Sequence, residues 1–503
     1  MKKLLCLVLA VISIFAMTAC GTGWKSEVTD YSGEVSSNGG FAVVKGDWVY
    51  YVNGVELNTA ENGFGTPVKG ALVRTKLADL GNENAVSQIV VPKLVYSDAT
   101  QDKGFYIFGD YVYYTSPSNE KNKAGEVLNT NLAFIRTKLD GTDTKVIHTA
   151  DALNVAYRFV ESGEKVYLVT NETVDGDNLL VSYDAATGKE VAKSSKITSY
   201  LFPEDLTADY CYYVEVAHDE VLDEDEAFHN VKKFNFDGTG DALVLSGDMG
   251  TQGVTFSLIK DTGANLFFSE TYVDTSVSNI TRYLGVKKAD LGEDAAQNYA
   301  KAVLLNNSTT DASIIFDSKS YFADFDCIVY HDATYGFIRY NYTDAANPET
   351  FGHQQLISDK KVVETVSALT VAFYEGGYVY MTNSDNYYYR VELEALLNGT
   401  ATATQVTYVA LKTTSTWHNP EIVNGFMLAA VSDEPFYGYV YATALVTEEL
   451  TEDEKEAKYD LYDFTVEENI VSFVNTRIGV VTENDKTAYE TYMEETFEDE
   501  DEE

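Results

Sequence analysis

The sequence predicts an all-β fold, a β-propeller of eight four-stranded antiparallel blades, with seven blades as the alternative. Three observations lead to this prediction: a tyrosine-rich strand motif recurs, a second strand with an Asp turn follows most copies, and proline is scarce. The 503 residues include 37 tyrosines and only seven prolines. Tyrosine favours strands, whereas proline interrupts their hydrogen-bonded ladders. We expect the propeller to occupy residues 41–447.

The first strand of the repeat is a short run of aliphatic and aromatic residues. Its copies begin 45 to 63 residues apart, with a mean interval of 54. Propeller blades repeat at roughly 40–50 residues, so the unit is slightly long but of the right size. The eight copies are GDWVYYVNG (46–54), GDYVYYTSP (109–117), GEKVYLVTN (163–171), ADYCYYVEV (208–216), GANLFFSET (263–271), FDCIVYHDA (325–333), GGYVYMTNS (376–384) and the degenerate NGFMLAAVS (424–432).

A second strand follows the first, often with an aspartate turn at its end. In AFIRTKLDG (133–141) the residues alternate as in a strand between two sheet faces, and Asp140-Gly141 suits a tight turn because glycine accepts positive φ. TKVIHT (144–149) then predicts an outer strand, and NVAYRFVE (154–161) is assigned as the fourth strand of the unit. Four short antiparallel strands repeated radially describe a propeller.

The clearest copy of the whole repeat combines GDYVYY (109–114) with IRTKLDGT (135–142). It resembles the G-D-x-I-Y-Y strand, and the following L-Y-R-x-x-x-D-G-T strand and turn, of propellers of the low-density-lipoprotein-receptor type and of a related group of bacterial lipoproteins. The resemblance implies a propeller fold. It implies no chemistry, because that bacterial group has no assigned function.

The N-terminus predicts a lipid anchor. Met1-Lys2-Lys3 precedes an apolar run, Leu4 to Ala19, that is followed at once by Cys20. This pattern is typical of a bacterial lipoprotein signal; a plain secretory signal lacks the cysteine, and about 16 apolar residues are few for a retained membrane span. We therefore expect residues 1–19 to be a signal peptide and Cys20 to carry lipid, so that the protein faces the extracytoplasmic side of the bacterial cell envelope. Residues 20–40 are expected to form a flexible tether, with a span of about 25 Å.

Charge restricts the partners. Removal of residues 1–19 takes Lys2 and Lys3 away, which changes the formal charge from −43 to −45. Such acidity argues against nucleic acid and against electrostatic attraction to an anionic membrane. It favours cations, neutral molecules or basic proteins, although it is equally expected of an exported protein that must only stay soluble. Cys211 and Cys327 fall in non-adjacent repeats on opposite strand faces, which predicts two free thiols rather than a disulfide.

The C-terminal extension, residues 448–503, holds 21 acidic and four basic side chains. Within it, 461–481 alternates like strands that could pack on the ring or close it. The last ten residues, 494–503, have no apolar face and are expected to be disordered.

No catalytic motif is present, and no cofactor is expected. None of the six histidines has H-E-x-x-H spacing, and neither a G-x-S-x-G elbow nor a phosphate-binding glycine loop occurs. The densest polar feature runs from His218 to His229. A metal there would be held by histidines and carboxylates, which leaves open a metal site or a solvated acidic loop. Its candidate ligands are His218, Asp219, Asp223, Asp225 and His229.

Loop lengths indicate a binding face. From the first to the second strand the aligned gap is 24, 23 and 21 residues in units one, two and four, but 10 and 12 in units six and seven. Equivalent loops emerge on one face of a propeller, and insertions there often build the binding surface. The long loops are 52–70, 115–131 and 218–229. We expect a module that binds a glycan or a peptide there rather than an enzyme, although the sequence leaves enzyme activity open. The alternatives are a polysaccharide lyase or hydrolase with its site at the central channel, a scaffold in an envelope complex, or loops that vary in length without function.

Overall fold

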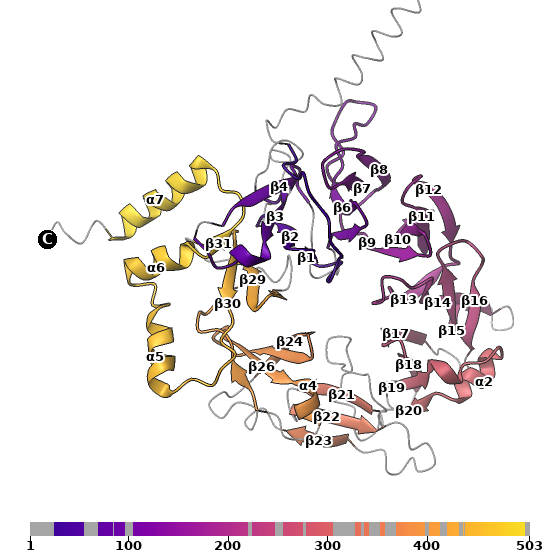
Figure 1. Ribbon diagram of the computed structural model, residues 1–503. Helices are drawn as coiled ribbons and strands as arrows, with labels where there is room; N and C mark the ends of the chain where they lie inside the picture. Colours follow the sequence, from indigo (N-terminus) through magenta and orange to yellow (C-terminus); the bar gives the residue numbers. More distant parts are fainter. Residues whose placement is uncertain are drawn as a thin grey trace, which may run out of the picture. The chain divides into compact units, whose positions relative to one another are not determined.

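The structure, a computed structural model, describes residues 25–54, 69–83, 85–95, 104–219, 224–246, 255–274, 278–304, 327–332, 336–341, 353–357, 369–397, 402–412, 420–431, 436 and 438–497 (Figure 1). The chain divides into two compact units. Unit 1 comprises Met1–Val155, Lys412–Leu445 and Tyr459–Glu503, and unit 2 comprises Ala156–Leu411 and Val446–Lys458.

The fold is an all-β propeller with four-stranded antiparallel blades. The blades of unit 1 are β1(Ala42–Lys45) β2(Trp48–Val52) β3(Leu72–Lys76) β4(Ser87–Val91), then β5(Tyr106–Phe108) β6(Tyr111–Pro117) β7(Leu132–Lys138) β8(Lys145–Ala150), and β28(Glu421–Val423) β29(Phe426–Ala430) β30(Val440–Ala444) β31(Arg477–Ile478).

Unit 2 holds the remaining sheets. They are β9(Ala156–Ser162) β10(Lys165–Val174) β11(Asp177–Asp184) β12(Lys189–Lys193), β13(Ile197–Leu201) β14(Tyr210–Asp219) β15(Glu224–Asn235) β16(Ala242–Ser246), β17(Thr255–Asp261) β18(Asn265–Asp274) β19(Ser278–Lys287) β20(Val303–Leu304), β21(Cys327–Asp332) β22(Gly336–Asn341) β23(His353–Ile357), and β24(Thr370–Glu375) β25(Tyr378–Thr382) β26(Tyr388–Glu392) β27(Thr404–Gln405). The short helices η1(Leu77–Asp79), η3(Lys288–Asp290), α2(Ala295–Ala300) and α4(Leu393–Leu397) follow strands or join them.

The number of four-stranded blades corrects the sequence prediction. Within the described residues seven sheets have four strands, while the sixth repeat forms the three-stranded sheet β21–β22–β23. In the described part of this repeat, β21, the copy of the recurring motif, pairs with β22. The prediction of eight four-stranded blades is therefore wrong, and the alternative of seven is what the structure shows.

The order of strands within a blade also differs from the prediction. The run 154–161 was assigned as the last strand of the second repeat, but β9 is the first strand of the third blade. Ser162 and Lys165 face each other across a two-residue turn in which Gly163 has a φ of +63°. A turn this short joins neighbouring strands of one sheet, so the recurring motif is the second strand of its blade.

The core lies between blades that follow each other in the chain. In unit 2, Val160 and Val169 of one blade share a buried cluster with Cys211, Tyr213 and others of the next. Cys211 is a free, buried thiol, as predicted. The side chain of Cys327 lies outside the described residues.

In unit 1 the last blade joins the first. Leu428, Ala430 and Val440 are buried in the same cluster as Val43 and Val49. The backbone N–H of Ala42 donates to the carboxylate of Glu421 at 3.0 Å, which links β1 to β28. These contacts connect segments almost 400 residues apart in sequence.

The segment 25–40 corrects a second prediction, because it is not a flexible tether. Val28 is buried, and the side-chain amide of Asn38 makes two hydrogen bonds to the backbone of Ile107, at 2.9 and 2.8 Å. Local composition suggested flexibility, but Asn and Ser side chains here pair with strand backbones instead.

The C-terminal extension is largely helical, which corrects the strands predicted for 461–481. Its described residues contain α5(Glu452–Asp460), α6(Glu467–Val474) and α7(Glu483–Phe497), with β31 as their single strand. β31 pairs with β30 and completes the last blade. The end of α7 also overturns the disorder predicted for 494–497. No described helix is long and apolar enough to cross a membrane.

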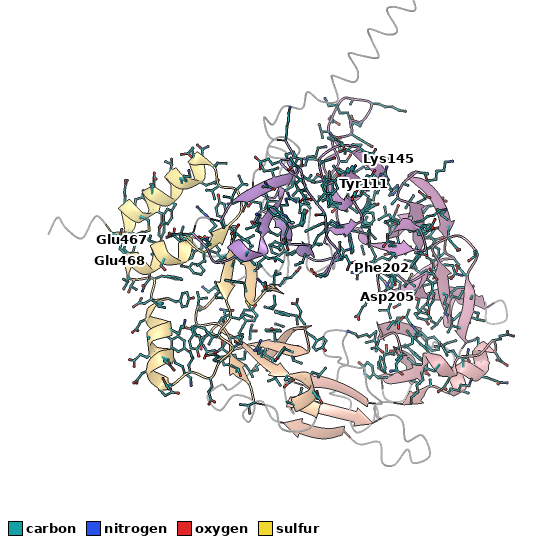
Figure 2. All side chains as sticks on the ribbon, viewed as in Figure 1. Tyr111, Lys145, Phe202, Asp205, Glu467 and Glu468 are labelled. Atoms are coloured by element: carbon teal, nitrogen blue, oxygen red, sulfur yellow. The ribbon has the colours of Figure 1, made fainter. Side chains whose placement is uncertain are left out.

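Aromatic packing explains α6. Phe473 is buried, stacks on Tyr441 with ring centroids 4.8 Å apart, and meets Phe436 edge to face at 4.9 Å. At the other end of the helix, Glu467 and Glu468 occupy the first turn (Figure 2), where negative charge is favourable beside the unpaired N–H groups. Helical spacing places Ile470 and Phe473 on one buried face, so burial and not alternation decides the local structure.

Candidate functional site

The loop between β6 and β7, residues 118–131, has a defined structure of its own. Asn122 organises its tip: its side-chain oxygen accepts from the N–H groups of Ala124 (2.9 Å) and Glu126 (3.0 Å), and its amide donates to the Glu126 carboxylate at 2.7 Å. At the base of the loop the N–H of Ser118 donates to the carbonyl of Asn131 at 2.7 Å. One of the three long loops predicted from the sequence is thus a preformed element.

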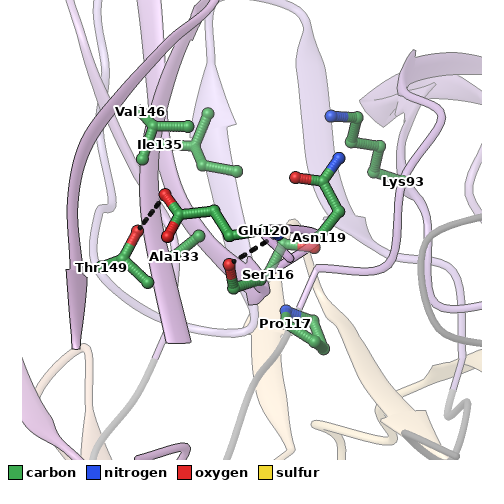
Figure 3. Close-up of a pocket in the computed structure, with 10 residues that line it drawn as sticks. Lys93, Ser116, Pro117, Asn119, Glu120, Ala133, Ile135, Val146 and Thr149 are labelled. Carbon is green, nitrogen blue, oxygen red and sulfur yellow. Dashed lines mark hydrogen bonds between the residues drawn. The ribbon is translucent and has the colours of Figure 1, made fainter. Parts of the chain in front are cut away.

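A small pocket of about 40 Å³ lies at the base of this loop (Figure 3). Its wall combines hydroxyl, amide, carboxylate and ammonium groups with apolar side chains. The lining residues are Lys93, Ser116, Pro117, Ser118, Asn119, Glu120, Ala133, Ile135, Val146 and Thr149.

Strand register produces the pocket. Ser116, Ala133 and Thr149 lie directly opposite one another on β6, β7 and β8, so they share one face of the sheet. Because Ala133 is small, it leaves room between its two polar neighbours. Ser116, which lines the pocket, is 2% exposed and therefore lies on its buried side.

Hydrogen bonds fix the polar rim. The N–H of Glu120 donates to the hydroxyl of Ser118 at 3.1 Å, and the hydroxyl of Thr149 donates to the Glu120 carboxylate at 3.3 Å (Figure 3). Glu120 therefore reaches from the loop to the outer strand β8. Its carboxylate retains capacity for further donors, since each of its two oxygens can accept more than one hydrogen bond.

The volume decides what the pocket can hold. A water needs about 10–15 Å³ measured this way, so about 40 Å³ takes roughly three waters or one hydroxyl-bearing arm of a ligand. Pockets that enclose a whole small molecule are about 300–1,000 Å³. The site fits one branch of a larger, surface-bound ligand.

The other predicted loops are only partly described. Of 52–70, the structure describes 52–54 and 69–70. In 218–229 it corrects the loop to a strand extension, because His218 and Asp219 lie on β14 and Asp225 and His229 on β15. Asp223 and the side chains of the other four lie outside the described residues, so the metal site stays a prediction. Elsewhere in the described part of the chain, no group of three or more His, Cys, Asp or Glu could hold a metal.

His148 is the one histidine with a described side chain. Its ring stacks on Phe134, with centroids 6.0 Å apart and planes 16° from parallel. It belongs to the packing of β7 and β8.

A second polar cluster, in unit 2, was not anticipated from the sequence. The ammonium of Lys288 donates to both carboxylate oxygens of Asp261 at 2.9 Å, and that of Lys233 lies 4.1 Å above the Tyr210 ring. Burial opposes ionisation of Tyr210, but a hydrogen bond with Tyr212 and the two lysine charges outweigh it and lower the pKa of Tyr210. The charges are paired within the cluster, which joins two consecutive blades. Lys288 follows Tyr210 by 78 residues, so no sequence motif could reveal it.

Comparison with known proteins gives no family. No protein-family model matches the chain, and no curated protein matches it. Among solved structures it is similar to an oligogalacturonate lyase in complex with manganese (12% identity, 84% of this chain and 98% of that chain, TM-score 0.34). Others are the tricorn protease (11% identity, 75% of this chain and 36% of that chain, TM-score 0.34) and a prolyl endopeptidase (11% identity, 71% of this chain and 51% of that chain, TM-score 0.38). The chain thus spans about a third and a half of those two peptidases. Similarities this distant carry no activity over, and the fold assignment rests on the sheets themselves.

Proposed function

We propose that this protein is a binding module of the bacterial cell envelope, anchored by lipid on Cys20 and facing the extracytoplasmic side. It engages a glycan, or else a peptide, through the pocket at the base of the 118–131 loop. The observation that carries the proposal is that this pocket is preformed. The loop above it is held by its own hydrogen bonds, so binding costs little ordering of the chain.

The chemistry of the pocket favours a glycan. Ser116 and Ser118 offer hydroxyls, Asn119 offers an amide, and Glu120 accepts hydrogen bonds from sugar hydroxyls. Val146, which is 48% exposed, supplies apolar surface at the edge of the pocket for the C–H face of a sugar ring whose hydroxyl arm enters it. The net charge of −43 disfavours polyanionic chains, so the preferred ligand is neutral or basic.

Calorimetric titration of neutral and amino-sugar oligosaccharides against residues 21–503 tests ligand binding. Glu120→Gln should weaken binding at least tenfold, because it removes the charged acceptor at the rim. Lys93→Gln should weaken it as well, whereas Lys123→Gln, which removes the same charge from the exposed loop tip, should leave it unchanged. Binding of every oligosaccharide at wild-type strength by Glu120→Gln would contradict the proposed site. Binding of peptides alone would select the second ligand class.

Membrane fractionation tests the anchor separately. Cys20→Ala removes the residue that would carry lipid, so the protein should move from the membrane fraction to the soluble fraction. Continued retention in the membrane would contradict lipidation, whatever the ligand. Calcium binding, measured in the same titrations, would instead assign the 218–229 carboxylates and histidines to a metal.

A further inference from the structure

The first described residues are held against the end of the second blade. The hydroxyl of Ser26 donates to the carbonyl of Leu139 at 3.1 Å, immediately after β7 ends. Glu27 pairs with the edge of the first blade: its N–H donates to the Ile89 carbonyl at 2.8 Å, and the Ile89 N–H donates to its carboxylate at 2.8 Å. Val28, 4% exposed, is buried between these contacts.

The following residues are held along the first blade. The guanidinium of Arg74 donates to the carbonyl of Asp30 at 2.5 Å, and the N–H of Gly46 donates to the carbonyl of Glu34 at 2.9 Å. Gly33 and Gly46 approach so closely that a Cβ on Gly33 would lie 2.5 Å from the Cα of Gly46. The N-terminal segment is therefore fixed to the propeller from Ser26 onward.

Ser26 contacts one end of the second blade, whereas the 118–131 loop lies at the other end and the pocket beneath it reaches inward to Ile135, at the middle of β7. Strand β7 runs from Leu132, beside the pocket, to Lys138, beside the Ser26 contact. Seven residues of strand span roughly 23 Å. The turn at Gly109–Asp110 lies at the Ser26 end, because the N–H of Leu139 donates to the carbonyl of Asp110 at 2.9 Å.

The chain between Cys20 and Ser26 is short. At 3.3–3.6 Å per residue it spans at most about 21 Å when fully extended. A lipid on Cys20 would thus keep Ser26 within about 21 Å of the bilayer surface, instead of allowing the reach of a 20-residue tether. This distance is similar to the length of the blade itself.

We infer that the end of the second blade that carries Ser26, Leu139 and Asp110 faces the membrane, and that the 118–131 pocket opens away from it. This inference rests on the proposed lipidation of Cys20. It assigns the pocket to ligands beyond the lipid surface, such as wall or extracellular glycans, and not to lipid headgroups. This end of the blade carries both signs of charge, with exposed Asp110 and Asp143 near Lys138 and Lys145, so charge alone gives no strong attraction to anionic lipid and the tether length sets the orientation.

Energy transfer from a single label to an acceptor lipid tests the orientation. The lipidated protein, with Cys327→Ser and Cys211 left buried, is labelled at Asp110→Cys or at Lys123→Cys and reconstituted into phosphatidylcholine vesicles. Both positions are exposed and belong to the same blade, one at each end. Loss of donor fluorescence at position 110 should exceed the loss at position 123. Equal losses, or a greater loss at 123, would overturn the inference.

Two controls separate this result from the proposed anchor. Flotation with the vesicles reports lipidation alone, so protein that fails to float contradicts the anchor, while floating protein with equal losses contradicts only the orientation. Insertion of 20 Gly/Ser residues after Gly21 adds a coil of about 25 Å and should shrink the difference between positions 110 and 123. A difference unchanged by the insertion would also overturn the inference, since the short tether would then not set the orientation.

Discussion

The side-chain amide of Asn53 forms two hydrogen bonds with the backbone of Val480, 427 residues later. Its Nδ2 donates to the Val480 carbonyl at 2.9 Å, and its Oδ1 accepts from the Val480 N–H at 3.1 Å. Asn53 follows β2 and is 1% exposed, while Val480 follows β31. One buried amide thus attaches the end of the last blade to the first.

Asn53→Ala should lower the free energy of unfolding by about 1–3 kcal/mol, because two partly buried backbone groups of Val480 lose their partner. Asn53→Asp should also destabilise, since a carboxylate can accept from the Val480 N–H but cannot donate to its carbonyl. Guanidinium-induced unfolding measures both. An unchanged midpoint in both variants would mean that water replaces the amide without cost.

Gly479→Ala should be more damaging than the same change at Gly425. Both glycines have positive φ, +110° and +81°. A Cβ on Gly479 would lie 2.0 Å from Oδ1 of Asn53, whereas a Cβ on Gly425 meets nothing within 4 Å. Gly425→Ala should cost only about 1–2 kcal/mol of backbone strain. In an Asn53→Ala background the clash is absent, so the loss of stability caused by Gly479→Ala should be smaller than in the wild type. Thermal unfolding of Gly425→Ala, Gly479→Ala, Asn53→Ala and the Asn53→Ala/Gly479→Ala double variant measures this. Equal costs at 425 and 479 would contradict the steric account.

The basic residue on the third strand of several blades makes a cation–π contact with an aromatic ring on the second strand. The guanidinium of Arg136 on β7 lies 4.7 Å from the centroid of the Tyr111 ring, at the start of β6. Figure 2 labels Tyr111. The same diagonal pairing of a basic residue on the third strand with the first aromatic residue of the second strand recurs in three other blades. These pairs are Arg74 with Trp48 at 3.9 Å, Lys233 with Tyr210 at 4.1 Å, and Arg390 with Tyr378 at 4.2 Å.

Arg136→Ala should reduce stability by roughly 1–2 kcal/mol, as the sum of a partly exposed cation–π contact and the 3.1 Å ion pair with Asp143. A double-mutant cycle with Tyr111→Leu isolates the ring contact, and its coupling energy should be about 0.5–1 kcal/mol. Asp143 binds both partners, since it pairs with Arg136 and accepts a hydrogen bond from the Tyr111 hydroxyl at 2.8 Å. The cycle repeated in an Asp143→Asn background, which removes the shared charge, is therefore the matched control. A coupling energy of zero would mean that the basic–aromatic pairs recur only because the strand register places these residues side by side, and not because the contact is stabilising.

Features set by local sequence were predictable. The motif residues Val49 and Val112 are fully buried on β2 and β6, and Asp140-Gly141 forms the expected turn. In that turn Gly141 has a φ of +81°, and the N–H of Thr142 donates to the Asp140 carboxylate at 2.9 Å. The long 115–131 loop was identified by its length, although the pocket beneath it was not.

Features set by distant partners were not predictable. The sequence around Asn38 is typical of a linker, and only the contact with the backbone of Ile107 shows that the residue is fixed. Phe473 fits a strand pattern as well as a helical one, and its stacking on Tyr441 favours the helix. Likewise, the pocket needs Ala133 opposite both Ser116 and Thr149, which depends on strand register. Periodicity locates strands, but it does not say which side chains meet across blades.

Alkaline pH should unfold the protein in step with ionisation of its buried tyrosines. Burial raises the pKa of Tyr114 to about 12, and it also raises the pKa of Tyr51 and Tyr441. An unfolded tyrosine titrates near pH 10. Below about pH 10 the folded and unfolded states both keep their phenolic protons, so the free energy of unfolding is unaffected by these tyrosines. Above about pH 10 only the unfolded state releases the protons, and the free energy of unfolding falls by up to about 1.4 kcal/mol per pH unit for each such tyrosine.

Denaturant midpoints between about pH 8 and pH 11, with tyrosinate absorbance recorded in parallel, measure this slope. Tyr114→Phe should make it shallower, whereas Tyr459→Phe, at an exposed position, should not. Tyrosinate absorbance that rises fully before the fold is lost would contradict the prediction.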